Sequence, residues 1–161
     1  MTFRQMIATV SLCLISITAN LSQAQTLQIP EFGALLPNIV DVKPGKMTAV
    51  DGLWNISTID KVVRIDRGRV YVIEGWNHML IMKIKPGMVV ITPFQEEAPG
   101  IFAGQDLPLQ GPLKAVLTGD RILDVTVAGA MGEARYQLIP QQLDDPEAFN
   151  GLIKEVRAAG R

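Results

Sequence analysis

Cysteine is nearly absent from this sequence, whose 161 residues contain only Cys13. Cys13 lies within residues 1–24, a segment with the pattern of a removable secretory signal. A chain without this segment has no cysteine, which excludes disulfides and thiol chemistry. Its hydrophobic core must hold the domain together, and at this length one domain buries about two-thirds of its unfolded surface.

The first 24 residues have three parts. Arg4 gives a short charged head, an apolar run extends from Met6 to Leu21, and the small-x-small end Ser22-Gln23-Ala24 precedes Gln25. We therefore predict a signal peptide that is cleaved after Ala24. A transmembrane anchor is the alternative, but the run carries Thr, Ser and Asn and is shorter than the ~20 residues that a span needs. We expect no stable membrane span after cleavage.

An excess of charge of one sign is also missing. The chain has 15 basic and 16 acidic residues, and loss of Arg4 with the signal would leave 14 basic residues. Basic residues between positions 61 and 69 are interleaved with aspartates, which is typical of a solvated hairpin. We expect no nucleic-acid partner, because phosphate binding needs clustered Lys and Arg. A cysteine-free exported domain fits a bacterial periplasmic or secreted location.

Histidine is as scarce as cysteine, since His78 is the only one. One histidine cannot form a multi-histidine metal site, and a general base would need an orienting partner and a nucleophile. The acidic residues form no D-x-D-x-D-G calcium loop, and the glycine-rich segment 129–132 lacks the lysine of a phosphate loop. The sequence therefore nominates no catalytic residue, metal ligand or cofactor site, and we expect a non-enzymatic protein.

Alternation of apolar and polar residues begins after Lys46 and predicts β-strands. Short alternating or β-branched runs follow one another between turn signals over residues 51–140. We predict an all-β fold with one C-terminal helix, in which a small antiparallel up-and-down meander barrel has about eight short strands. The proline-punctuated segment 25–50 is predicted to be a lead-in that packs over one end of the domain, with a flexible tether as the alternative.

Two turns fix the pairing of neighbouring strands. Gly68 stands in Ile65-Asp66-Arg67-Gly68-Arg69-Val70, where a tight hairpin needs positive φ. Lys85-Pro86-Gly87-Met88 has proline and glycine at the central positions of a type II turn.

Three stretches are less regular. Residues 79–84 are apolar on both faces and predict a strand covered on both sides, preceded by a turn at Gly75-Trp76-Asn77-His78. Residues 93–100 predict a loop. Residues 101–109 predict an irregular return, because Pro108 cannot donate to a sheet.

A helix is predicted within the C-terminal segment 141–161. Asp145 suits an N-cap, Pro146 the first helical position and Arg157 the last turn. An apolar stripe at helical spacing must dock on the barrel, and we expect it to cover the strand that carries Met79 and Ile81. The members of the stripe are Phe149, Leu152, Ile153 and Val156.

Gly52-Leu53-Trp54 at the head of the first strand, a meander of about eight strands and a helix after the last one resemble the calycin and lipocalin-like small barrels. The resemblance implies that Trp54 closes one barrel end. It also implies that a basic residue of a late strand, Arg135 or Arg121, packs across this tryptophan. An apolar ligand carried in the interior is the function that it implies.

Bulky inward-facing residues instead predict a filled interior, since a barrel of about eight strands is only just wide enough for its side chains. We then expect a periplasmic interaction module that contacts an envelope protein through its surface, with Trp76, Asn77, His78 and Met79 as the partner-binding candidates. A carrier of a small apolar molecule is the alternative. The predicted barrel core comprises Trp54, Ile56, Ile65, Leu80, Met82, Leu123, Val125, Tyr136 and Leu138.

Overall fold

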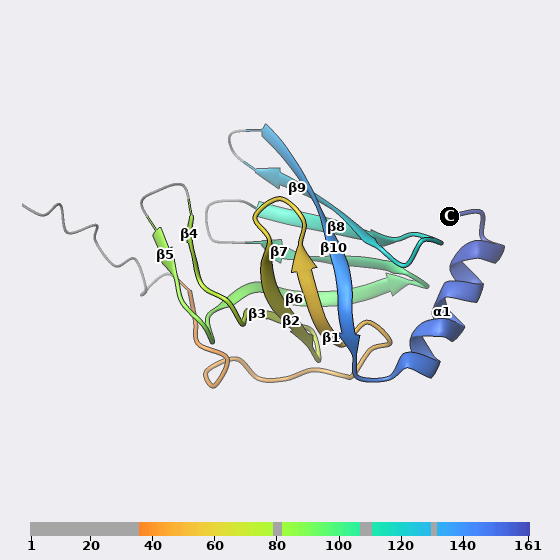
Figure 1. The fold of residues 1–161 in the computed structure, drawn as a ribbon, viewed down its shortest axis with the longest axis horizontal. Coiled ribbons are helices and arrows are strands. Elements are labelled where there is room, and N and C mark those ends of the chain that lie inside the picture. Colours follow the sequence, from red (N-terminus) through yellow and green to blue (C-terminus); the bar gives the residue numbers. More distant parts are fainter. Residues whose placement is uncertain (1–35, 79–81, 107–110, 130–131) are drawn as a thin grey trace, which may run out of the picture.

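A computed structural model describes residues 36–78, 82–106, 111–129 and 132–161. These residues form ten strands and one helix (Figure 1). Their bounds are β1 Gly52–Ile56, β2 Lys61–Asp66, β3 Arg69–Val72, β4 Trp76–His78, β5 Met82–Ile84, β6 Val89–Ala98, β7 Ile101–Asp106, β8 Gly111–Leu117, β9 Leu123–Gly129, β10 Gly132–Leu143 and α1 Pro146–Ala158.

Eight of these strands close into one antiparallel barrel. The order around the barrel is β1-β10-β9-β8-β7-β6-β3-β2, and β2 pairs with β1 to complete the ring. Neighbours in the barrel are also neighbours along the chain, except where β3 meets β6 and where β1 meets β10. The predicted all-β barrel with a C-terminal helix is therefore confirmed.

Both predicted turns have the expected backbone. Arg67 and Gly68 have φ of 46° and 79°, so both central residues of the β2–β3 hairpin are left-handed, as a tight turn between twisted strands requires. Gly87 has a φ of 85°, and the Met88 amide donates to the Lys85 carbonyl at 3.2 Å. This is the predicted turn, with Pro86 setting the preceding position.

The hairpin of β4 and β5 lies outside the barrel. These two strands pair with each other, Trp76 with Ile84 and His78 with Met82, while β3 pairs directly with β6. The prediction of a turn at residues 75–78 was wrong, because Trp76–His78 is a strand. Met82 and Ile84 are buried, so one face of the hairpin packs inward. The predicted run 79–84 is described only from Met82 onward, and Met79, Leu80 and Ile81 lie outside the described residues.

Residues 93–100 are not the predicted loop, since β6 continues to Ala98. The pairing of β6 with β7 shifts in register between Ile91 and Phe94. A proline has no N–H to donate and is tolerated at such an irregularity, which explains how Pro93 lies inside a strand. The predicted irregular return likewise begins with a regular strand, β7, which pairs with both β6 and β8.

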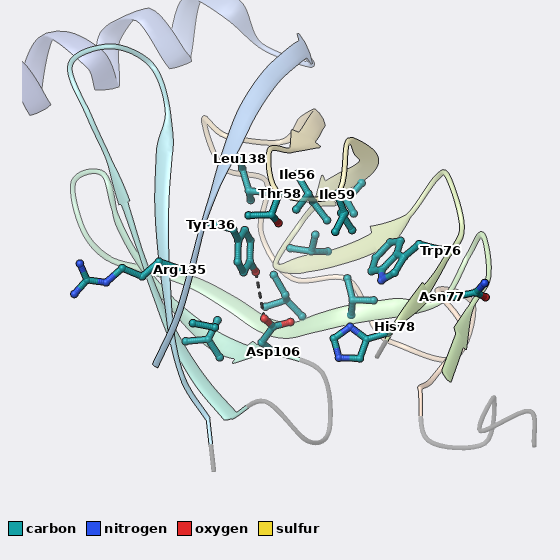
Figure 2. A pocket seen from close by; sticks show the side chains of 16 residues that line it. Ile56, Thr58, Ile59, Trp76, Asn77, His78, Asp106, Arg135, Tyr136 and Leu138 are labelled. Atoms are coloured by element: carbon teal, nitrogen blue, oxygen red, sulfur yellow. Dashed lines mark hydrogen bonds between the residues drawn. The ribbon is translucent and has the colours of Figure 1, made fainter. Parts of the chain in front are cut away.

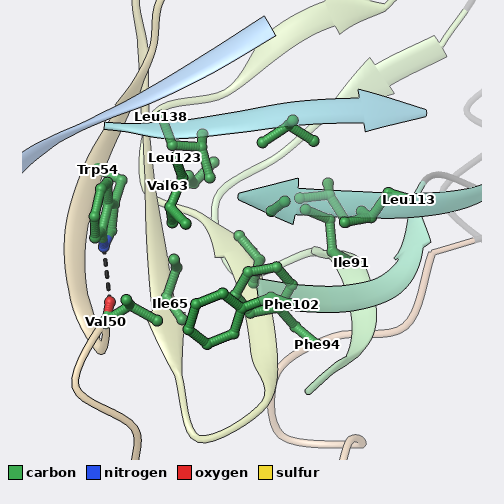
Figure 3. Packing of buried hydrophobic residues seen from close by; sticks show 14 of the residues in the cluster. Val50, Trp54, Val63, Ile65, Ile91, Phe94, Phe102, Leu113, Leu123 and Leu138 are labelled. Atoms are coloured by element: carbon green, nitrogen blue, oxygen red, sulfur yellow. Dashed lines mark hydrogen bonds between the residues drawn. The ribbon is translucent and has the colours of Figure 1, made fainter. Parts of the chain in front are cut away.

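Large side chains fill one half of the barrel (Figure 3). Trp54 is fully buried, and its indole N–H donates to the Val50 carbonyl at 2.8 Å. The rings of Phe94 and Phe102 stack with centroids 5.1 Å apart and an angle of 7° between their planes. Ile65 is fully buried in the same cluster. This half has the packed interior that the sequence predicts for the whole barrel.

The capping of helix α1 agrees with its sequence. The Asp145 carboxylate accepts from the Ala148 amide at 2.9 Å, Pro146 occupies the first turn, and Arg157 lies in the last. The expected docking site was wrong, because α1 lies at the opposite end of the barrel from β4 and β5 (Figure 1). Only two residues separate α1 from β10, so the helix must pack at the barrel end where β10 finishes. The four residues of its apolar stripe are buried there.

Three contacts fix α1 against this end. The Phe149 ring meets Trp54 edge-on, with centroids 6.0 Å apart and an interplanar angle of 72°. The Arg157 guanidinium donates to the Gly119 carbonyl, between β8 and β9, at 2.7 and 3.0 Å. Val156 lies against Gly100 in the β6–β7 turn. The helix therefore closes the end of the barrel at the packed half.

Candidate functional site: a cavity in the open half of the barrel

A cavity of about 310 Å³ opens at the barrel end away from α1 (Figure 2). Barrel strands supply most of its wall, and β4 together with the β1–β2 turn supplies its rim. The expectation of an interior filled along its whole length was therefore wrong. The cavity is lined by Ile56, Thr58, Ile59, Val63, Val70, Trp76, Asn77, His78, Val90, Ile91, Asp106, Val127, Ala134, Arg135, Tyr136 and Leu138.

The size of the inward side chains explains why this half is open. Val63, Val70 and Val127 face the cavity from three different strands, and each is almost fully buried. Valine leaves more room in a ring of eight strands than the indole and phenyl rings that occupy the other half. The strand period of two decides which residue of each strand faces inward. The cavity is thus built by ordinary barrel geometry from smaller residues.

Asp106 and Tyr136 form the polar centre of the wall (Figure 2). Asp106 is the last residue of β7 and is 9% exposed, and Tyr136 faces it from β10. The Tyr136 hydroxyl donates to Oδ2 of Asp106 at 3.3 Å. Burial, and then the charge and the hydrogen bond of Asp106, raise the pKa of Tyr136 well above its usual value. Tyr136 is therefore a neutral hydrogen-bond donor throughout the physiological pH range.

The rim carries Trp76 and His78 on β4, both half-buried, with the exposed Asn77 between them. Burial lowers the pKa of His78 below its ordinary value of 6.5, which favours the neutral imidazole at pH 7. Three of the four partner-binding candidates therefore lie at the cavity mouth. The fourth, Met79, lies outside the described residues.

Neither arginine singled out by the resemblance stacks on the Trp54 ring in the way expected. Arg121 lies at the correct end, but its guanidinium carbon is 4.9 Å from the ring centroid of Phe149, which itself contacts Trp54. Arg135 lies on the wall of the open half and points away from the cavity (Figure 2). Its Nε donates to a Glu133 carboxylate oxygen at 2.6 Å.

The predicted core residues divide between the two halves of the barrel and the hairpin. Trp54, Ile65, Leu123 and Val125 are buried without lining the cavity. Leu138 is buried and also reaches the cavity wall, whereas Ile56 and Tyr136 line it while half-buried. Met82 is buried on β5, outside the barrel, and Leu80 lies outside the described residues.

Asp106 is the site residue that the sequence analysis missed. The segment 101–109 gave no expectation of a strand, so no face could be assigned to it. Once β7 is a strand, alternation places Phe102, Gly104 and Asp106 on one face, and burial of Phe102 and Asp106 marks that face as inward. The available signal in the sequence was the spacing of four residues between Phe102 and Asp106, which places both side chains on the same face of a strand.

The closed antiparallel barrel of eight strands with a terminal helix is compatible with a calycin-like architecture. Comparisons with protein-family models, curated proteins and solved structures give no match for this chain. Within the described ranges, no three His, Cys, Asp or Glu side chains converge as a metal site would need. No helix in these ranges is long and apolar enough to span a bilayer.

Proposed function

We propose that this protein binds a small, largely apolar molecule in the open half of its barrel, as members of the lipocalin-like group do. The cavity of about 310 Å³ is the observation that carries this proposal. Ligand sites are typically concave and mostly apolar, with a few polar groups that orient the ligand, and begin at about 300 Å³. The valine wall and the Asp106–Tyr136 pair fit this description.

The cavity volume limits the size of the ligand. An apolar cavity of about 150 Å³ accepts benzene, so a cavity of twice that volume suits a compact molecule of about 10 to 15 non-hydrogen atoms. The packed half would support such a site, because a rigid scaffold reduces the ordering cost of binding.

Titration with 1-naphthylmethanol, a compact neutral probe, tests the proposal by calorimetry and tryptophan emission. We expect saturable binding to the wild-type protein. Val127→Phe would fill the cavity from its buried wall, and Ala134→Phe would narrow it from an exposed position, so both should weaken binding at least about tenfold. Ala128→Phe is the matched control, because Ala128 is the exposed neighbour of Val127 on β9 and does not line the cavity. Absence of saturable binding to the wild type would refute the proposal.

Contact with an envelope protein through β4 and β5 is the second candidate. The observation that favours it is the position of this two-stranded sheet outside the closed barrel, where its edges are not part of the barrel ladder. An exposed strand edge can pair with a strand of another protein. In this case Lys83→Pro, at an exposed position of β5 that does not line the cavity, would abolish partner capture from an envelope extract and leave naphthylmethanol binding intact.

Export to a periplasmic or secreted location completes the proposal. It is supported by the sequence pattern of residues 1–24, which lie outside the described ranges. Mass analysis of the exported protein should give a chain that begins at Gln25. An intact N-terminus in the membrane fraction would contradict export with cleavage.

A further inference from the structure

We propose that the cavity selects apolar amines, whose ammonium group binds the Asp106 carboxylate, and discriminates against organic acids of the same shape. This inference rests on the proposed ligand-binding function and names its substrate class. The cavity, the position of Asp106 in its wall and the placement of the other ionisable side chains carry it.

Asp106 brings a carboxylate to an otherwise largely apolar wall. The group lies at the end of β7 and is directed into the cavity, where the Tyr136 hydroxyl reaches it from β10 (Figure 2). An ionised carboxylate can accept about four hydrogen bonds, so it can keep protein donors such as the Tyr136 hydroxyl and still accept from a ligand. Hydrogen bonds between two charged groups are about twice as strong as those between neutral groups.

The lining has three other ionisable side chains, Arg135, His78 and Tyr136, and none is expected to add a positive charge inside the cavity at pH 7. Arg135 is directed away from it, with 76% of its side chain exposed and its guanidinium paired with Glu133. Burial lowers the pKa of His78, which favours its neutral imidazole at pH 7. Tyr136 is neutral as well. A carboxylate ligand would therefore meet a like charge in a site of reduced dielectric, which is unfavourable, whereas an ammonium group would meet an opposite charge.

Trp76 adds a second feature that suits a cation. Its indole ring faces the cavity from the rim formed by β4 (Figure 2). The face of a tryptophan ring attracts ammonium groups, and recognition of amines in aromatic-lined sites uses this property. A compact amine can thus place its hydrocarbon part against the valines and its charged group between a carboxylate and an indole ring.

Three probes of the same shape separate charge from fit: 1-naphthylmethylamine, 1-naphthylmethanol and 1-naphthoic acid. At pH 7 they are cationic, neutral and anionic. We expect the amine to bind at least about tenfold more tightly than the alcohol, and the acid at least about tenfold more weakly than the alcohol. Calorimetry with the full mature chain gives all three affinities.

Asp106→Asn should remove the advantage of the amine while preserving binding of the alcohol, because the amide has the shape of the carboxylate but no charge. Asp124→Asn is the matched control, since Asp124 is exposed on β9, accepts from Gln137 and does not line the cavity. It should leave the order of the three affinities unchanged. Tyr136→Phe keeps the carboxylate and should also keep the preference for the amine.

The outcomes are distinct. Failure of all three probes to bind would overturn the ligand-binding function, and this inference with it. Equal affinities of the three probes, or a preference for the acid, would overturn the inference alone and leave a neutral apolar site. If Asp106→Asn does not fold, the affinity order on the wild-type protein decides by itself. Retention of the amine preference in a folded Asp106→Asn protein would assign the selectivity to another group and refute the role of Asp106.

Discussion

The two halves of this barrel share one set of strands and differ in what the strands carry. Toward α1, the interior contains the rings of Trp54, Phe94 and Phe102, and the helix closes the end. Toward β4 and β5, valines replace the rings, and a cavity of about 310 Å³ remains. Backbone geometry fixes the diameter of the barrel, so the size of the inward side chains decides whether the interior is filled or contains a cavity. The packed half supplies stability, and the open half supplies a site.

Removal of α1 should have the largest effect, because it opens the packed end. Its four buried apolar side chains each contribute about 1.5 to 3 kcal/mol, which together approaches the whole stability of a typical domain, about 5 to 15 kcal/mol. A chain that ends after Asp144 should therefore lose its cooperative unfolding transition and bind a hydrophobic dye strongly. A truncated chain with an unchanged transition would mean that the helix is an independent tail.

The two tryptophans offer a direct contrast between the halves. Trp54→Ala should cost about 3 to 5 kcal/mol of unfolding free energy, because a fully buried ring leaves a large void. Trp76→Ala removes a half-buried ring at an already open cavity and should cost less than about 2 kcal/mol. Urea denaturation measures both. Similar losses for the two variants would contradict the division into a packed and an open half.

A gentler pair tests the same contrast with one methyl group. Ile65→Val should cost about 0.5 to 1.5 kcal/mol in the packed half. Ile56→Val should cost less than about 0.5 kcal/mol, since Ile56 lines the cavity and its lost methyl group leaves no closed void. Denaturation midpoints at constant slope would report the difference. A larger loss of unfolding free energy for Ile56→Val than for Ile65→Val would contradict tighter packing in the half toward α1.

Tyr136 links the open half to pH. Its raised pKa in the folded protein means that the folded state holds the phenol proton more tightly than the unfolded chain does. This contribution to stability is fully present below about pH 10, the unfolded value, and is lost as pH rises from there through the folded pKa. Stability should fall by up to about 1.4 kcal/mol per pH unit in this window, and Tyr136→Phe should flatten the decline. Denaturation between pH 8 and pH 11 checks this, and equal slopes for the two proteins would contradict a raised pKa of Tyr136 in the folded state.

Much of the fold could be predicted from local signals in the sequence. Alternation revealed most strands, Gly68 and Gly87 revealed two turns, and Asp145 with Pro146 revealed the start of the helix, because each signal depends on near neighbours alone. The displacement of β4 and β5 from the barrel depends instead on the long-range pairing of β3 with β6. Similarly, the docking end of α1 depends on where β10 finishes, which its own apolar stripe does not encode.

The site was only partly predictable for the same reason. The sequence pointed to Trp76 and His78 through their residue types, and these two do lie at the cavity rim. The meeting of Asp106 with Tyr136 joins residues 30 positions apart and depends on the register of the strands between them. A cavity is a property of facing side chains around the whole ring, and no single segment shows it.

The indole N–H signals give the most direct test of the central claim, because the chain has two tryptophans, Trp54 in the packed half and Trp76 at the rim of the cavity. In a ¹H–¹⁵N spectrum titrated with 1-naphthylmethanol, the Trp76 signal at the cavity rim should shift and saturate. The Trp54 signal, from a buried N–H bonded to Val50, should stay in place. Movement of the Trp54 signal alone, or of neither signal at saturating probe, would contradict an open half that binds beside a packed half that does not.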